Sequence, residues 1–379
     1  MRIAFYAPMK PPTSATPSGD RLIARLLMTA LEHAGNSVTL ASRFRSYDRT
    51  GDSDRQRRVQ AVGEKLSDRL IRYVNSMTEA ERPQLWFTYH VFHKAPDWIG
   101  PRVSKALGIP YVIAEASHAP KQENGPWDSG CRSAKSAIEQ ADLVFGMNEI
   151  DAECVRPLLA TPDRYVAISP FIDAEPFVAA RRDRAAHRET LARDLDISGA
   201  DPWLLCVAMM RSGDKVDSYQ ILAQALARLA DQPWRLIVIG SGPAENEVKA
   251  AFSACNDRIS WLGTREAGEM PAIYAACDAF VWPAVKETPG MCFLEAQAAG
   301  LAVVGSHAGG VPEIVEDQVT GFLPKHMDAV EFADATAKLL RDPDLRHTMG
   351  MAAAERMASM HNVAAAGRSL ASAFGRLKQ

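Results

Sequence analysis

Two glutamates with seven residues between them, Glu287 and Glu295, lie in the stretch KETPGMCFLEAQAAG at positions 286–300. The apolar run AFVWPA just before them predicts a strand, and the small-residue run after them predicts a helix that ends at Gly300. The loop between strand and helix is then the carboxyl end of a parallel strand, where open α/β sheets bind ligands. Glu287 is therefore expected at a ligand site, in position to meet hydroxyl groups.

The start of the predicted helix adds a second kind of contact. Gly290 lets the backbone approach a ligand closely. The free amides of Met291 and Cys292 form an anion site, with Pro289 just before them. Glu295 falls about one turn inside the helix, where its carboxylate can accept hydrogen bonds from the vicinal hydroxyls of a ribose. The predicted contacts would thus bind sugar hydroxyls, a diphosphate and a ribose, in that order. This is the order of groups in a nucleotide sugar. Taken alone, the motif is equally consistent with two solvated glutamates at a helix start.

Short apolar runs rich in β-branched and aromatic residues alternate with amphipathic stretches along the chain. The runs are RIAFYA, SVTLAS, QLWFTYH, PYVIAEAS, DLVFGM, RYVAIS, WLLCVAM, RLIVIG, RISWLG, AFVWPA and LAVVGS. Strand–helix alternation of this kind predicts parallel sheets that are covered on both faces. The predicted fold class is therefore α/β.

The 379 residues are too many for one ordinary core and fit two domains. The alternation pauses over about 170–200, where a charged segment precedes the run at Trp203, and we place the division there. The predicted domains are 1–172 and 173–361, each Rossmann-like, with a last helix over about 362–379 that packs back on the first domain. Their parallel sheets are expected to face a central cleft.

The composition, 47% hydrophobic and 23% charged, is that of a soluble globular protein. A net charge of -3 gives no broad basic surface for nucleic acid. The six cysteines contain no C-x-x-C pair, which favours reduced thiols over disulfides or a zinc site. No run reaches the ~20 apolar residues of a membrane span, and the N-terminus lacks the features of a signal peptide. We expect a cytoplasmic protein, with peripheral contact to a membrane surface left open.

The motif of the two glutamates continues into a longer pattern, KETPGMCFLEAQAAGLAVVGSHAGGVPEIVEDQVTGF. This pattern resembles the family 4 retaining glycosyltransferases of the GT-B fold, whose signature is Glu, seven residues, Glu and a helix ending in A-x-G. Other segments that follow the family order are IEQADLVFGMN, YVAISPFIDAEPF, RLIVIGSGP, RISWLG and YAACDAFVWPAVKE. The resemblance covers nearly all of the C-terminal half and, more loosely, the N-terminal half. It implies a hexosyltransferase-type enzyme that moves a sugar from a nucleoside-diphosphate sugar to a hydroxyl acceptor, with retention and without a metal ion or other cofactor.

The resemblance also implies which residues act on the donor. Arg211 and Lys215, in VAMMRSGDKVDSYQ, correspond to family cations that stabilise the charge of the leaving diphosphate. The spacing here is one residue shorter than in the family, and Val216 replaces a glycine. Glu287 would orient the hydroxyls of the transferred sugar, and Glu295 would bind the ribose. In the front-face mechanism of the family, a phosphate oxygen takes the acceptor proton, so no protein nucleophile is needed.

Further donor contacts are implied at the turns after two later strands. Gly242, in the turn GSGP, suggests that the backbone approaches the donor. Thr264 and Arg265 follow RISWLG, where such enzymes hold the base through the main chain. Main-chain recognition leaves the identity of the base unreadable from the sequence.

In the N-terminal half the family pattern is looser. Gly19, in PMKPPTSATPSGDR, stands where the family has paired glycines. His118, in VIAEASHAP, lies at a predicted strand end, and the resemblance implies contact with the donor sugar or the acceptor. The alternative for His118 is a purely structural hydrogen bond. His90 and His93, in TYHVFHK, are secondary candidates at the same edge.

Other functions are weighed against the transferase. A nucleotide-sugar-binding GT-B protein without transferase activity and a GT-B nucleotide-sugar epimerase would both keep the fold. A phosphorylase is disfavoured because no long insertion carries a lysine for a pyridoxal cofactor. An NAD-dependent enzyme would need G-x-G-x-x-G after the first strand, where the chain has APMKPP instead.

The acceptor is expected to bind the N-terminal domain, at loops 9–20, 43–58 and 119–130. Polysaccharide, lipid-linked and small-molecule acceptors all remain open. The Arg-rich segment 43–58 is predicted as a solvated loop, with contact to an acidic acceptor or lipid headgroups as the alternative. Its Asp52 and Asp54 match the metal-binding D-x-D pattern, but no strand presents them, so no metal site is predicted. Trp127 either stacks on a sugar or packs inside the fold.

Overall fold

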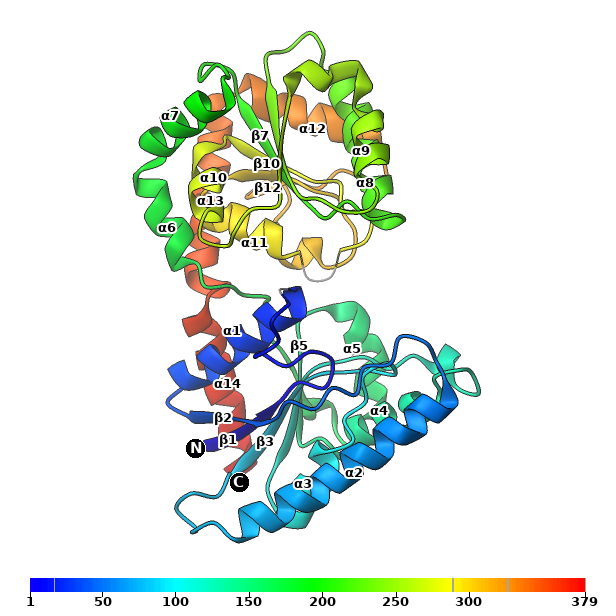
Figure 1. Cartoon of the computed structure of the whole chain (residues 1–379). Coiled ribbons are helices and arrows are strands. Elements are labelled where there is room, and N and C mark those ends of the chain that lie inside the picture. Colours follow the sequence, from blue (N-terminus) through cyan, green and yellow to red (C-terminus); the bar gives the residue numbers. More distant parts are fainter. Residues whose placement is uncertain (17, 288–289, 326, 379) are drawn as a thin grey trace. The chain divides into compact units, whose positions relative to one another are not determined.

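The computed structural model describes residues 1–16, 18–287, 290–325 and 327–378. It divides into two compact units, one made of Met1–Ser169 with Val363–Gln379 and the other of Pro170–Asn362. Each unit contains a six-stranded sheet in which all paired strands are parallel (Figure 1). The α/β prediction with two Rossmann-like units is therefore confirmed.

The first unit has the strand order β2-β1-β3-β4-β5-β6. Its strands are β1 (Arg2–Tyr6), β2 (Ser37–Ser42), β3 (Leu85–Val91), β4 (Tyr111–Ala116), β5 (Leu143–Gly146) and β6 (Tyr165–Ala167). Its helices are α1 (Gly19–His33), α2 (Ser53–Asn75), α3 (Gly100–Leu107), α4 (Asp128–Gln140), α5 (Glu149–Val155) and α14 (Val363–Phe374). The last helix, α14, packs against α1, so a segment from the end of the chain completes this unit (Figure 1).

The second unit has the strand order β12-β11-β10-β7-β8-β9. Its strands are β7 (Trp203–Val207), β8 (Arg235–Ile239), β9 (Ile259–Gly263), β10 (Ala279–Val281), β11 (Ala302–Val304) and β12 (Gly321–Phe322). Its helices are α6 (Glu175–Arg182), α7 (Arg184–Leu195), α8 (Asp214–Ala227), α9 (Glu245–Ala251), α10 (Met270–Ala276), α11 (Met291–Ala298), α12 (Ala329–Arg341) and α13 (Pro343–Met360). Both β7 and β10 lie in the interior of this sheet, so their side chains are buried on both faces.

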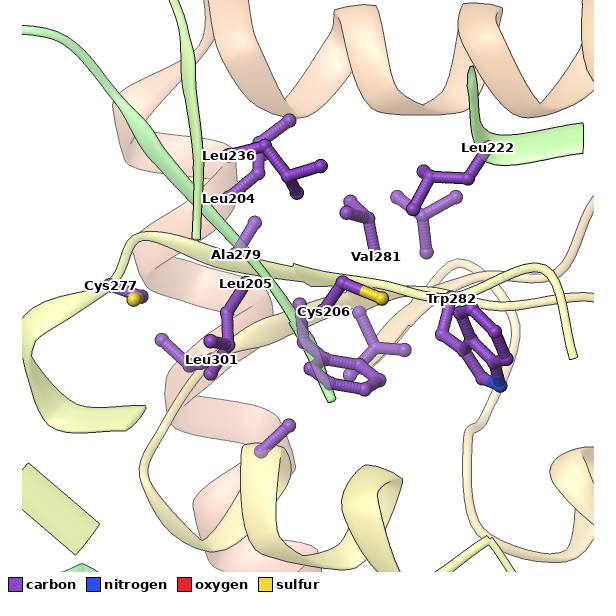
Figure 2. Close-up of a cluster of buried hydrophobic side chains, with 14 of the residues drawn as sticks. Leu204, Leu205, Cys206, Leu222, Leu236, Cys277, Ala279, Val281, Trp282 and Leu301 are labelled. Carbon is purple, nitrogen blue, oxygen red and sulfur yellow. The ribbon is translucent and has the colours of Figure 1, made fainter. Parts of the chain in front are cut away.

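The core of the second unit forms around β7 and β10 (Figure 2). Leu204, Leu205 and Cys206 from β7 pack near Ala279 and Val281 from β10, and Trp282 lies at the carboxyl end of β10. These side chains are almost fully removed from solvent. A close-packed core directly below the carboxyl ends of two strands gives the loops that follow a rigid base.

The Arg-rich segment departs from the prediction of one solvated loop. Its second part is the beginning of α2, which starts at Ser53. The Asp52 side chain caps this helix by accepting a hydrogen bond from the Arg55 amide at 2.6 Å. The Asp54 carboxylate pairs with Arg57 one turn later. The two aspartates of the D-x-D match are thus occupied with helix capping and an ion pair. No described helix is both long enough and apolar enough to cross a membrane.

Candidate functional site

The strand order of the second unit reverses between β7 and β10. The chain adds β8 and β9 on one side of β7 and then returns to place β10 on the other side. The loops that leave the carboxyl ends of β7 and β10 therefore diverge, and such switch points are where open α/β sheets bind ligands. Arg211 follows β7, and Glu287 follows β10. The topology thus brings two predicted site segments to one point.

Lys215 and Glu287 form an ion pair at this switch point, between Nζ and Oε2. Lys215 is the second residue of α8, and Glu287 lies in the loop after β10. Their side chains are only 10% and 16% exposed, so water screens the pair weakly. The Trp282 indole N–H donates to the same Glu287 oxygen at 3.3 Å, and Lys215 Nζ lies 5.3 Å from the centre of the Trp282 ring. One carboxylate oxygen is therefore shared by a cation and an indole.

Hydrogen bonds from two other segments hold this loop in place. Ser218 on α8 accepts the Val285 amide at 3.0 Å and donates to the Asp214 carbonyl at 2.7 Å. On the other side, the Gly310 amide donates to the Glu287 carbonyl at 3.0 Å. Gly309 has a φ of +56°, and a Cβ there would overlap that same carbonyl oxygen. A glycine is therefore needed at position 309, where the two backbones touch.

The first turn of α11 is where an anion site is predicted. Gly290 is the N-cap, and a Cβ on it would lie 2.6 Å from the Phe293 ring. Met291 and Cys292 are the first two residues of the helix, whose amides have no acceptor within the helix. Burial raises the pKa of the Cys292 thiol, and the Glu287 carboxylate raises it further, so the protonated thiol is favoured over the thiolate. Pro289, also predicted here, lies outside the described residues.

Glu295 lies further along α11, with its side chain half-buried. The Tyr274 hydroxyl, from α10, donates to Glu295 Oε2 at 2.8 Å. Burial raises the pKa of Glu295 to about 7, although the hydrogen bond from Tyr274 lowers it. A carboxylate held out of water in this way gains from further hydrogen bonds to a ligand.

The remaining predicted donor residues are more exposed. Arg211 is 53% exposed, with Nη2 3.5 Å from the Asp214 carboxylate, and it is not brought into contact with the Lys215–Glu287 pair among the described contacts. The Thr264 and Ser241 hydroxyls share a hydrogen bond of 2.8 Å, which joins the turns after β9 and β8. Arg265 pairs loosely with Glu269, at 3.8 Å.

Packing requires a glycine at position 242, because a Cβ there would overlap the Met210 carbonyl oxygen. The Met210 amide in turn donates to the Ser241 carbonyl at 2.9 Å, so the turns after β7 and β8 run side by side. Together these contacts form a hydrogen-bonding edge along the carboxyl ends of β9, β8, β7 and β10. Among the residues that the structure describes, no group of three or more His, Cys, Asp or Glu side chains is placed to hold a metal ion.

In the first unit, the predicted histidines differ in their surroundings. His118 follows β4 and is only 7% exposed. Its ring nitrogens lie 4.0 Å from Cys131 Sγ and 3.9 Å from the Glu123 carboxylate, and burial lowers its pKa. The ring is therefore nearly buried, and its surroundings favour the neutral imidazole over the charged one. His93 packs edge-on against Trp127, with ring centres 6.0 Å apart, and burial also lowers its pKa.

His90 has a more distinctive arrangement. Its Nδ1 lies 2.9 Å from the carboxylate of Asp20, which is next to the predicted Gly19 in the first turn of α1. This contact joins the segments after β1 and at the end of β3, where the strand order of the first unit reverses. His90 on β3 and Glu115 on β4 both have left-handed backbones, with φ of +65° and +59°. Burial raises the pKa of Glu115 to about 7.

Sequence reasoning missed two residues that contact the signature glutamates, Tyr274 and Trp282. Both fall inside the segment YAACDAFVWPAVKE, which carried the resemblance. The signal was the polar atom on each aromatic residue, since a buried tyrosine hydroxyl or tryptophan indole needs a hydrogen-bond partner. Spacing alone did not identify which partner each would find.

Comparisons with known proteins bear on the family resemblance and on the fold of this chain. Residues 201–342 match the family model described as "Glycosyl transferases group 1". A D-inositol 3-phosphate glycosyltransferase of Corynebacterium diphtheriae is 32% identical over 70% of this chain, and the match spans just under two thirds, 64%, of that relative. A protein of the same name from Pseudarthrobacter chlorophenolicus is 28% identical over 92% of this chain and 88% of its own length.

Solved structures share the architecture at low sequence identity. The Anabaena protein HepE, in complex with UDP, has a TM-score of 0.72 and 18% identity, over 99% of this chain and 100% of that one. A glycosyltransferase from Rickettsia africae has a TM-score of 0.74 and 15% identity, over 100% of this chain and 98% of that one. These likenesses establish the fold. The prediction of the GT-B fold is therefore confirmed, and the match over residues 201–342 supports the predicted resemblance to the group 1 glycosyl transferases of family 4.

Proposed function

We propose that the protein transfers a sugar from a nucleoside-diphosphate sugar to a hydroxyl acceptor, with retention of configuration and without a metal ion. The observation that carries this proposal is the Lys215–Glu287 ion pair at the switch point, beside the N-terminus of α11. It combines a low-exposure cation, a carboxylate and free amides, which suit a leaving diphosphate and the hydroxyls of the transferred sugar. HepE, a protein of similar structure, has been solved in complex with UDP-glucose, so UDP-glucose is the first donor to test.

In the proposed reaction the bond from the anomeric carbon to the diphosphate oxygen breaks, and the acceptor oxygen forms the new bond to that carbon. The acceptor proton goes to a phosphate oxygen of the leaving group. Lys215 and Arg211 stabilise the negative charge that the diphosphate gains. Glu287 orients the hydroxyls of the transferred sugar, Glu295 binds the ribose, and Thr264, Arg265 and Gly242 line the nucleoside side. His118 and Gly19 in the first unit are proposed to face the donor sugar or the acceptor.

The test combines binding with turnover. Thermal shifts are measured with UDP, GDP, ADP and their glucose conjugates, with Mg²⁺ or with EDTA. A nucleotide at ~100 times its Kd stabilises the protein by roughly 2.7 kcal/mol, which is readily detected. Release of the nucleoside diphosphate is then followed with a panel of acceptors that includes inositol 3-phosphate, the acceptor in the names of the relatives. NMR of the product reports its anomeric configuration.

The proposal expects binding and turnover that survive EDTA and a product with the donor's anomeric configuration. Binding with neither transfer nor hydrolysis would instead favour a nucleotide-sugar-binding protein. Loss of activity in EDTA, restored by Mg²⁺, would contradict the metal-independent mechanism. A product of inverted configuration would contradict retention.

A further inference from the structure

We infer that Tyr274 and Trp282 are positioning residues of the donor site: each holds one oxygen of one signature glutamate, so that the other oxygen faces the hydroxyls of the donor. This inference rests on the proposed function, since it concerns how the same site recognises its donor. It assigns a role to two aromatic residues that come from α10 and from the end of β10.

Tyr274 is rigidly placed for this role. Its ring is fully buried and packs against Phe177 and Phe280, with ring centres 5.6 and 6.2 Å away. Its hydroxyl donates to Glu295 Oε2 at 2.8 Å and lies 3.4 Å from the Cys292 carbonyl. Among the described contacts, Glu295 Oε1 takes no hydrogen bond. A carboxylate oxygen has two lone pairs, so this oxygen is left to accept hydroxyl groups of a ribose.

Trp282 holds Glu287 in a similar way. The indole is fully buried and packs against Tyr219, with ring centres 4.9 Å apart. Its N–H and the Lys215 ammonium both reach Glu287 Oε2, as described above. Over the described part of the chain, Glu287 Oε1 has no hydrogen-bond partner. Figure 2 shows the Trp282 side chain at the end of β10, at the edge of the apolar cluster.

The opposite explanation is that the glutamates only satisfy two buried aromatic residues. Other aromatic residues of the same unit do not need a carboxylate for this. The hydroxyl of Tyr219 donates to the Ala208 carbonyl at 2.8 Å, and the indole of Trp234 donates to the Leu229 carbonyl at 2.9 Å. A backbone carbonyl satisfies a buried donor without the cost of desolvating a charge. The use of carboxylates at the switch point therefore points to a function for the carboxylates.

The deciding measurement is discrimination between UDP and 2′-deoxy-UDP, by calorimetric titration of the full chain, with GDP and 2′-deoxy-GDP as a second pair. If Glu295 accepts the 2′-hydroxyl, the wild-type protein binds the ribonucleotide about tenfold or more tightly than its deoxy counterpart. Tyr274→Phe keeps the ring and removes only the hydroxyl, and it should reduce this ratio to about threefold or less. Tyr219→Phe is the matched control and should keep the wild-type ratio. A general loss of stability would weaken the binding of the ribonucleotide and of its deoxy counterpart equally, and would leave the ratio of the two affinities unchanged.

For Trp282, the measurement is donor turnover. Trp282→Phe should bind UDP within about threefold of the wild-type affinity but lower kcat about tenfold, because Glu287 no longer holds the sugar in one orientation. Trp234→Phe is the matched control. It removes an indole that donates to the Leu229 carbonyl and to neither glutamate, so this variant should keep the wild-type kcat. UDP binding by Trp282→Phe also shows that the variant is folded.

The outcomes separate this inference from the function on which it rests. Wild-type discrimination that is lost in Glu295→Gln but kept in Tyr274→Phe would leave the donor site standing and overturn the role of Tyr274. Wild-type kcat in Trp282→Phe would overturn the role of Trp282. If the wild-type protein binds no nucleotide, the proposed function fails, and this inference fails with it.

Discussion

Nζ of Lys215 and Oε2 of Glu287 meet across 72 positions of sequence and join the first turn of α8 to the loop after β10. A cation in the first turn of a helix opposes the helix dipole, so the carboxylate compensates for an unfavourable position. Because both side chains are nearly buried, removing one of them would leave the charge of the other unpaired, which destabilises the folded protein. In the proposed reaction, the pair therefore holds the Lys215 ammonium in place to stabilise the charge on the leaving diphosphate.

Lys215→Met should damage both stability and activity. Removing the ammonium leaves a poorly hydrated Glu287 carboxylate, which costs on the order of 3 kcal/mol. Donor turnover should fall about a hundredfold or more if Lys215 stabilises the leaving group. Denaturant unfolding and nucleotide release measure the two effects.

Two comparisons sharpen this test. Lys249→Met removes an exposed lysine of the same unit, paired with Glu245 one turn away, and should cost less than about 1 kcal/mol. The double variant Lys215→Met with Glu287→Gln should be more stable than Lys215→Met alone, since no charge is then left unpaired. Equal stability of the single and double variants would mean that the pair contributes nothing.

Glu295→Gln should stabilise the unliganded second unit at neutral and higher pH. The pKa of Glu295 is raised from 4.5 to about 7 in the folded state, so folding favours the protonated form. The wild-type protein therefore loses stability as pH rises from about 4.5 to about 7, and keeps that loss at higher pH. The upper limit is about 3 kcal/mol, because each tenfold change in proton affinity corresponds to about 1.4 kcal/mol. Glutamine has no charge to desolvate, so the variant does not lose stability in this pH range.

Hydrogen exchange of α11 peptides, compared between the two proteins at each pH, measures this difference. The variant and the wild-type protein should agree near pH 4.5 and separate as pH rises to 7. A constant difference across this range would show that Glu295 does not titrate there. The same variant should bind nucleotides more weakly, so the stability and binding effects have opposite signs.

Glu115→Gln makes the corresponding test in the first unit. Glu115 Oε1 accepts the Met147 amide at 2.6 Å, and a glutamine oxygen can keep this hydrogen bond. Because burial raises the pKa of Glu115 to about 7, the wild-type first unit also loses stability as pH rises from 4.5 to about 7. Peptides covering β4 and β5 should exchange more slowly in the variant at pH 8 and at equal rates at pH 4.5. Faster exchange at pH 8 would mean that the charged carboxylate is itself stabilising.

Much of the fold could be predicted because local patterns determine it. The apolar runs from RIAFYA to LAVVGS all contain strands, and the left-handed Gly35 after α1, with φ of +78°, ends that helix as its position suggests. The strand β12 gave no such signal, since it has only two residues, Gly321 and Phe322. The start of α2 was missed because its buried positions are mostly Gln56, Gly63 and Ser67, which form no apolar stripe.

The site was less predictable, because its contacts are between distant segments. The motif predicted that the carboxylates of Glu287 and Glu295 lie near a ligand, and the resemblance implied Arg211 and Lys215 as the cations. That Lys215 rather than Arg211 reaches Glu287 depends on how α8 starts after Gly213, whose φ is +86°. The partners Tyr274 and Trp282 depend on packing around β10. Such contacts follow from tertiary structure and not from spacing along the chain.

Gly309→Ala should impair the donor site without touching any charged group. The φ of +56° at Gly309 is costly for alanine, and its Cβ would overlap the Glu287 carbonyl oxygen. The loop must then move, and with it the Glu287 side chain that pairs with Lys215. We expect a loss of roughly 1–3 kcal/mol in stability and a weaker thermal shift with UDP. Gly268→Ala is the matched control, because Gly268 has no atom within 4 Å of its Cβ position and should tolerate alanine. If both variants bind UDP like the wild-type protein, contact between the Gly309 and Glu287 backbones does not position the donor site.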